Sequence, residues 1–190
     1  DRLFATYIED ASCMARSFDL AGRELGTVDI QGRGSVFGFS GERDHRETFY
    51  VYSDYVTTPT IYRYDLDLNA STVFKSPKTA FDSSPYQTKQ VFYAGKDGTR
   101  IPMWITARKD VRLDGDQPTL LYGYGGFNIP LTPGFSPANA MWLELGGVYA
   151  VANLRGGGEY GETWHEAGTR EHKQNVFDDF IAAGEYLVAQ

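Results

Sequence analysis

A glycine-rich stretch with a tyrosine at its centre, residues 120–129, has the residue types and spacing best suited to chemistry. Residues 118–122 are a short apolar run of the kind that fills a strand buried on both faces. The three glycines within residues 123–126 can adopt backbone angles that other residues resist, and they let a ligand approach the main chain. Tyr124 lies between them at the carboxyl end of the predicted strand, where open α/β sheets bind their ligands. Its phenol is an uncharged donor that could stabilise an oxyanion; the alternative is that the tyrosines only cover the end of the sheet.

A second glycine-rich stretch, residues 156–161, matches the dinucleotide-binding pattern G-x-G-x-x-G and follows a predicted strand. Three features count against a nucleotide site. Glu159 would place a carboxylate beside the pyrophosphate, and Trp164 and His165 crowd the turn. The next acidic pair, residues 178–179, lies on a predicted helix and not at the end of a strand. Nucleotide binding is therefore the least favoured interpretation of this stretch.

The three histidines, His45, His165 and His172, are too scattered in the sequence to indicate a metal site. No two of them have ligand spacing with acidic partners, and Cys13 is the single cysteine. His165 lies beside the second glycine-rich stretch, where it could shuttle a proton, although local hydrogen bonding is the commoner role of such a residue. We therefore expect no metal site.

A nucleophilic serine of the acyl-transfer type is not found in the sequence. Such a serine lies on a strand-to-helix turn with the pattern G-x-S-x-G. Ser35 and Ser40 lie in a region of predicted strands and lack this spacing, and Ser136 is followed by Pro137 and Ala138. If the protein is a hydrolase, its nucleophile lies outside these residues.

Charge and composition limit the partners and the compartment. The 190 residues include 18 basic and 25 acidic side chains, a net charge of −7, without a cluster of Lys and Arg. We therefore expect no nucleic-acid partner and no anionic-membrane partner. One cysteine excludes an internal disulfide, and no apolar run reaches the ~20 residues of a membrane span. We expect a cytoplasmic protein, with a periplasmic or secreted one as the alternative, and the start at Asp1 without an initiator Met indicates a piece of a longer chain.

The part of the chain before the Tyr124 region is predicted to consist of strands. Residues 3 to about 75 predict short strands and turns without an intervening helix, which favours an antiparallel β-meander such as a sandwich or roughly two blades of a propeller. The predicted strands are 3–8, 13–20, 25–30, 35–39, 48–52 and 60–64. Ser, Pro, Thr and Lys dominate residues 75–87, where no periodicity remains. We place a domain boundary there and assign residues 1–79 and 80–190 to two domains.

The second region predicts an α/β domain. A hairpin turn over 96–98 and a surface loop over 108–116 are expected. The predicted elements are strands 89–93, 101–106, 120–122 and 148–153, a helix over 137–145 that ends at Gly146-Gly147, and a helix that starts with Asn175 as its N-cap. The face of this last helix expected to pack on the sheet carries Phe177, Phe180, Ile181 and Leu187. The order of elements from residue 118 onward predicts a parallel sheet.

Three long segments carry a family resemblance. They are LYGYGGFNI at 121–129, GVYAVANLRGGGEYG at 147–161 and KQNVFDDF at 173–180. In this order they strongly resemble the prolyl oligopeptidase (prolyl endopeptidase) family of serine peptidases, and a weaker likeness extends through 86–99 to the β-meander. The resemblance implies the end of a seven-bladed β-propeller followed by the N-terminal part of an α/β-hydrolase domain. It also implies cleavage of short peptides after proline through an acyl-enzyme, without metal or cofactor.

The same resemblance assigns roles to two residues. Tyr124 corresponds to the tyrosine whose hydroxyl helps to stabilise the tetrahedral oxyanion, and Phe127 to a phenylalanine that lines the pocket for proline. We assign no chemical role to the loop 155–161, whose glycines are expected to allow close packing near the active site. The segment lacks the Ser, Asp and His of the triad. Two alternatives stay open, a related oligopeptidase with basic-residue specificity and a non-catalytic β-meander binding module.

Overall fold

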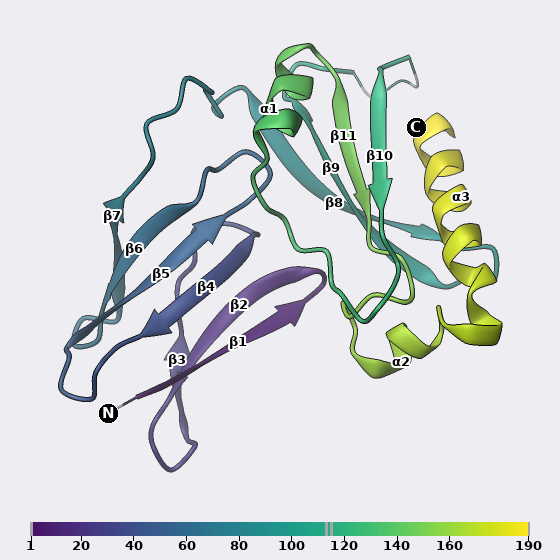
Figure 1. The fold of residues 1–190 in the computed structure, drawn as a ribbon. Helices are drawn as coiled ribbons and strands as arrows, with labels where there is room; N and C mark the ends of the chain where they lie inside the picture. Colours follow the sequence, from purple (N-terminus) through teal and green to yellow (C-terminus); the bar gives the residue numbers. More distant parts are fainter. Residues whose placement is uncertain (1, 113, 115, 190) are drawn as a thin grey trace. The chain divides into compact units, whose positions relative to one another are not determined.

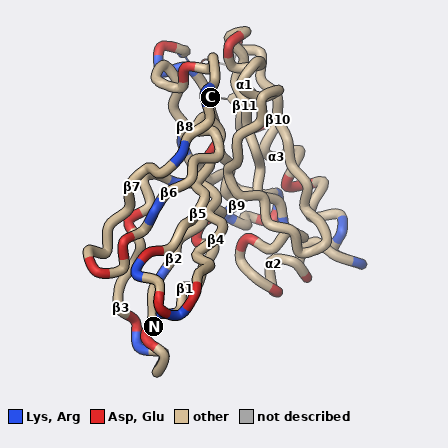
Figure 2. The backbone as a smooth tube through the Cα atoms, turned by 60° about the vertical axis from the view of Figure 1, so that its left-hand side comes forward, with Lys and Arg blue, Asp and Glu red and all other residues tan. Residues whose placement is uncertain are grey.

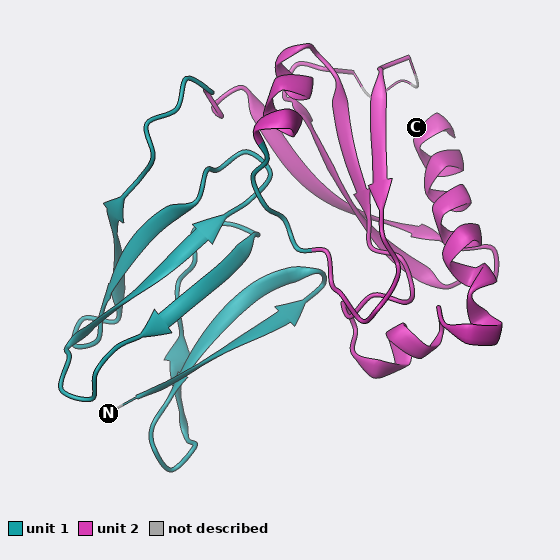
Figure 3. Cartoon of the chain, in the orientation of Figure 1, with its two compact units in different colours: residues 1–81, 132–136 teal, residues 82–131, 137–190 magenta. Residues whose placement is uncertain are grey.

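The computed structural model of the protein describes residues 2–112, 114 and 116–189 (Figure 1). The chain divides into two units, of which unit 1 comprises residues 1–81 and 132–136 and unit 2 comprises 82–131 and 137–190 (Figure 3). Residues 132–136 therefore belong to unit 1, although in the sequence they lie between the two parts of unit 2. The assignment of domains 1–79 and 80–190 stays a prediction.

Unit 1 contains two antiparallel sheets, with strand orders β1-β2-β3 and β4-β5-β6-β7. The strands are β1 (Leu3–Glu9), β2 (Ser12–Phe18), β3 (Glu24–Thr27), β4 (Ser35–Ser40), β5 (Glu47–Ser53), β6 (Thr60–Asp65) and β7 (Ala70–Lys75). The six strands predicted over residues 3–64 are confirmed, with ends shifted by a few residues. Strand β7 was not predicted. It lies at the edge of its sheet with nearly every residue exposed, so its sequence has no alternation of apolar and polar positions.

Alternation along β5 shows how the sequence builds the core of unit 1. Tyr50 and Tyr52 are buried, whereas the residues between and before them, Val51 and Phe49, are only half-buried. Tyr50 stacks on Tyr62, its partner on β6, with 5.2 Å between ring centroids. Such aromatic pairs contribute about 0.5–1.5 kcal/mol beyond the burial of their surface. Packed tyrosine rings therefore account for much of this core.

Unit 2 is built on one four-stranded sheet with the order β10-β11-β9-β8. Its elements are β8 (Tyr86–Ala94), β9 (Arg100–Arg108), β10 (Thr119–Gly123), α1 (Pro137–Glu144), β11 (Val148–Ala152), α2 (Glu162–Glu166), the 3₁₀ helix η1 (Arg170–His172) and α3 (Gln174–Ala189). Strands β10 and β11 are parallel, which confirms the parallel pairing predicted from residue 118 onward. The pairs β11–β9 and β9–β8 are antiparallel, so the sheet is mixed, and β8 and β9 form the predicted hairpin.

Helix α3 begins one residue earlier than predicted, at Gln174. Asn175 therefore lies in the first turn of the helix and does not cap it. Its side-chain amide donates to the carbonyl of Ala167 at 2.9 Å. The helix start is held by this contact with the preceding segment.

The face that α3 buries also differs from the prediction. Val176, Asp179 and Ala183 are buried, and Leu187 packs against the core as predicted. The prediction was wrong for the remaining three positions, which are exposed, namely Phe177, Phe180 and Ile181. A carboxylate can occupy the inward face because Asp179 is paired with a buried arginine.

The remaining predictions for unit 2 concern its helices and one loop. Helix α1 is confirmed and ends before Gly146, which has φ +90°. Helix α2 and η1 were not predicted, since five and three residues are too few for a periodic pattern. Leu113 and Gly115 of the predicted loop lie outside the described residues. Within the described part of the chain, no helix has the length and apolarity needed to cross a bilayer.

Candidate functional site

The loop that follows β10 places Tyr124 and Phe127 next to each other at the surface of unit 2. Strand β10 ends at Gly123, so Tyr124 lies at the carboxyl end of a strand, as predicted. Its side chain is 43% exposed and that of Phe127 is 82% exposed. The two ring centroids are 6.4 Å apart, with 30° between the ring planes. The loop thus presents an uncharged hydrogen-bond donor beside an apolar ring; the catalytic and binding roles of the two residues stay predictions.

The backbone of this loop is held in an unusual conformation. Phe127 and Asn128 have φ values of +54° and +56°, in the left-handed region, and Gly125 has φ +59°. The left-handed conformation costs about 1–2 kcal/mol for a residue with a Cβ atom, although Asn tolerates it better than most. Two hydrogen bonds oppose this cost: Asn128 N donates to Gly156 O at 3.1 Å, and Lys173 Nζ donates to Gly125 O at 2.8 Å. Neighbouring segments therefore hold the loop in place.

Glycines bring three backbone segments into contact beneath the loop. A Cβ atom would lie 2.9 Å from Arg155 O if built on Gly125, and 2.7 Å from Gly125 O if built on Gly156. One built on Gly168 would lie 2.7 Å from Arg155 O. Real Cβ atoms essentially never approach so closely, and backbone cannot move aside cheaply. Within the 155–161 loop, close packing is therefore confirmed for Gly156, whereas a Cβ atom on Gly161 would meet nothing within 4 Å. The position of the loop near an active site stays a prediction.

Replacing Gly168 by alanine is expected to lower the free energy of unfolding of unit 2 by about 1–3 kcal/mol, since the added methyl group overpacks against backbone. The matched control is Gly184→Ala in α3, where nothing lies within 4 Å of the new Cβ. That control should stabilise the protein by about 0.5–1 kcal/mol, as alanine is the better helix former. Urea denaturation of the complete protein, followed by hydrogen exchange of residues 148–189, measures both changes. Equal effects of the two substitutions would contradict the packing argument.

A buried ion cluster that sequence analysis missed centres on Arg155. Arg155 is 5% exposed, and its Nε and Nη2 donate to the carboxylate of Asp179 at 2.9 and 2.6 Å. Its Nη1 donates to Asp97 in the β8–β9 turn at 2.6 Å, and this hydrogen bond holds the pKa of Asp97 well below its usual range. Arg155 therefore joins the end of β11 to the hairpin turn and to α3. The signal in the sequence was Asp179, an acidic residue on the face of the helix that packs inward. A carboxylate buried in this way requires a cationic partner.

Glu159 and Asn153 hold the other end of the Tyr124 loop. Glu159 Oε1 accepts hydrogen bonds from Leu131 N at 3.0 Å and from Asn153 Nδ2 at 3.1 Å, and Asn153 Nδ2 also donates to Leu131 O at 2.7 Å. Burial raises the pKa of Glu159. A Cβ atom on Gly158 would lie 2.6 Å from Asn128 O, so protein atoms already pack against this glycine. A buried carboxylate and covered glycines agree with the arguments against a dinucleotide site.

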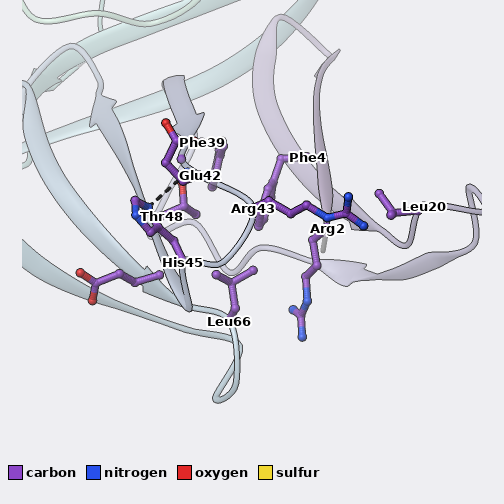
Figure 4. A pocket seen from close by; sticks show the side chains of 11 residues that line it. Arg2, Phe4, Leu20, Phe39, Glu42, Arg43, His45, Thr48 and Leu66 are labelled. Carbon is purple, nitrogen blue, oxygen red and sulfur yellow. Dashed lines mark hydrogen bonds between the residues drawn. The ribbon is translucent and has the colours of Figure 1, made fainter.

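The three histidines lie in different surroundings. His45 lines a pocket of about 360 Å³ in unit 1, together with Phe4, Phe39 and several charged side chains (Figure 4). His172 lies in η1, and His165 Nδ1 is 3.1 Å from Asn128 N in the loop after β10. Among the described residues, no three His, Cys, Asp or Glu side chains are grouped as a metal ion would require.

Charged side chains of both signs are interspersed along the described chain (Figure 2). Several pair at the surface of unit 1, namely Arg16 with Glu24, Arg46 with Asp67 and Arg63 with Glu47. Exposed pairs of this kind contribute about 0–1 kcal/mol each. They therefore contribute little to the stability of unit 1.

Comparison with known proteins matches both parts of the chain to one family. The family profile for the prolyl oligopeptidase N-terminal β-propeller domain matches residues 1–77, and that for the prolyl oligopeptidase family matches residues 133–190. A prolyl endopeptidase of Elizabethkingia miricola is 50% identical over 184 residues, which are 97% of this chain and 26% of that protein. A prolyl endopeptidase of Dictyostelium discoideum is 39% identical, over 100% of this chain and 25% of that protein. The chain thus spans about a quarter of the length of these curated relatives.

Solved structures give the same result. One from a structural and mechanistic study of two prolyl endopeptidases has a TM-score of 0.94 at 46% identity, covering 100% of this chain and 28% of that chain. Prolyl oligopeptidase B from Galerina marginata, bound to a 35mer hydrolysis and macrocyclization substrate, has a TM-score of 0.91 at 35% identity, over 98% and 27% of the two chains. The predicted fold class is confirmed, with antiparallel blades followed by the start of an α/β-hydrolase sheet. The chain belongs to the prolyl oligopeptidase family.

Proposed function

We propose that the complete protein is a serine endopeptidase that hydrolyses short peptides on the carboxyl side of proline. Its family membership and the prolyl endopeptidases at 49–50% identity support this activity. The observation that carries the proposal is the exposed pair of Tyr124 and Phe127 on the loop after β10. A phenol and an apolar ring on one loop suit a substrate whose carbonyl develops negative charge beside a pyrrolidine ring.

In the proposed reaction the serine nucleophile comes from a part of the protein outside these 190 residues. Its oxygen attacks the carbonyl carbon of the proline residue while a histidine base takes the hydroxyl proton. Tyr124 donates a hydrogen bond to the carbonyl oxygen as that oxygen becomes negative, and Phe127 packs against the proline ring. The tetrahedral intermediate then collapses to an acyl-enzyme as the C–N bond breaks and the histidine gives its proton to the leaving amine. Water hydrolyses the ester in the second half of the cycle.

The proposal is tested by assaying the complete protein with peptide reporters that place proline, alanine or arginine before the scissile bond. We expect kcat/KM for the proline reporter to exceed that for alanine by about 10²-fold, because an apolar pocket built for a ring discriminates by a few kcal/mol at most. A serine-directed phosphonylating reagent should abolish turnover. Preference for arginine would favour the basic-specific relative, and no hydrolysis of any reporter by the intact protein would reject the peptidase in favour of a binding module.

A further inference from the structure

A histidine on helix α2 lies against the left-handed turn that carries Phe127. Figure 1 shows the loop after β10 passing beside α2 before the chain continues to α1. His165, on α2, places its Nδ1 2.8 Å from Gly156 O and 3.1 Å from Asn128 N. Asn128 N also lies 3.1 Å from the same Gly156 carbonyl. The His165 imidazole, the Gly156 carbonyl and the Asn128 amide therefore meet next to Phe127 in the chain.

The distances assign the proton within this group. One ring nitrogen cannot donate to the Gly156 carbonyl and accept from the Asn128 amide at the same time. The shorter contact joins Nδ1 to an oxygen that only accepts, so Nδ1 carries a hydrogen and donates it to Gly156 O. That carbonyl then receives two hydrogen bonds, one from His165 and one from Asn128, and its position fixes the main chain next to Phe127.

Helix α2 is itself held by hydrogen bonds of Trp164, the residue before the histidine. Gly156 N donates to Trp164 O at 2.9 Å, and Trp164 Nε1 donates to Leu154 O at 3.0 Å. Asn128 Nδ2 lies 3.5 Å from Glu162 Oε2, a longer contact on the same helix. The imidazole thus joins a fixed helix to a turn whose backbone conformation is unfavourable without support.

We propose that His165 is a positioning residue that fixes the Phe127–Asn128 turn and thereby sets the selectivity for proline. The inference deepens the proposed function and rests on it, because it takes Phe127 as the residue that contacts the proline ring. His165 acts through the main chain and does not touch the reacting atoms. Its loss should therefore change substrate binding more than the chemical step.

The test uses the complete protein and compares His165→Asn with His165→Gln. The amide nitrogen of asparagine can occupy the place of Nδ1, whereas that of glutamine reaches the place of Nε2. We expect His165→Asn to keep the wild-type ratio of kcat/KM for proline over alanine reporters. His165→Gln and His165→Leu should lower that ratio about tenfold, mainly by raising KM for the proline reporter.

Two further variants serve as the positive and the negative control. Phe127→Ala should lower the proline-to-alanine ratio at least as much as His165→Leu, and Glu166→Gln, an exposed position on the same helix, should leave it unchanged. A merely structural role would lower stability without changing the ratio in the folded protein. Equal ratios for the asparagine and glutamine variants would overturn the proposal, even if the leucine variant did not fold. A wild-type protein without proline preference would instead reject the proposed function.

Discussion

Replacing Tyr124 by phenylalanine in the complete protein is expected to lower kcat for a proline reporter about 10²–10³-fold, with KM nearly unchanged. The phenol donates its hydrogen bond to an oxygen that becomes negative only as the carbonyl is attacked, so its removal affects the transition state and not the bound substrate. Phenylalanine keeps the ring and its packing beside Phe127. Steady-state kinetics with the proline reporter measure both parameters.

The matched control for this substitution is Tyr122→Phe. Tyr122 is 46% exposed, close to the exposure of Tyr124, but it lies within β10 rather than on the loop. Its variant should retain kcat within about threefold of the wild type, the usual range of a surface change away from the reacting atoms. If Tyr124→Phe also stayed within that range, Tyr124 would not be an oxyanion donor, whatever the specificity of the enzyme.

Replacing Arg155 by methionine is expected to lower the free energy of unfolding of unit 2 by about 3–5 kcal/mol. The substitution leaves Asp179, which is 0% exposed, as a buried carboxylate without its cationic partner. It also releases the β8–β9 turn, because Arg155 no longer donates to Asp97. Urea denaturation of the complete protein, with hydrogen exchange of α3 as the readout, measures the loss.

The neighbouring acidic residue supplies a control for the Arg155 substitution. Asp178 pairs with Lys96 at 3.5 Å, and the lysine side chain is 78% exposed. Lys96→Ala should cost only about 0–1 kcal/mol, because the lysine is solvated and Asp178 keeps its hydrogen bond from Gln174 Nε2. The double substitution Arg155→Met with Asp179→Leu should recover most of the stability, because apolar side chains can replace a buried pair. A methionine variant no less stable than Lys96→Ala would show that burial of Asp179 carries no penalty.

Strands β5 and β7 of the same sheet show what an alternating pattern contributes to a prediction. Strand β5 alternates clearly and was predicted, whereas β7 is exposed along almost its whole length and was not. The misassigned face of α3 has a different cause. Apolar Phe177, Phe180 and Ile181 lie outside and Asp179 lies inside, because Asp179 pairs with an arginine 24 residues away in the sequence. Periodicity carries no information about a partner so distant.

Some features of the candidate site were predicted from the sequence and others were not. The location of Tyr124 after a strand followed from the apolar run and the glycines around it, and the close packing of Gly156 followed from its residue type. The left-handed conformation of Phe127 and the contact with His165 did not follow from the sequence. Both depend on α2, whose five residues are too short to show a helical period.

The order in which the chain contributes to the two units affects how the protein folds during translation. Residues 132–136 complete unit 1, where Thr132 Oγ1 lies 2.6 Å from Ser35 Oγ and Phe135 N donates to Ser53 Oγ at 3.1 Å. A ribosome releases the chain from its N-terminus, so residues 82–131 emerge before this last piece of unit 1. The first unit therefore cannot finish folding before much of the second has been translated, and the two must mature in overlapping steps on the nascent chain.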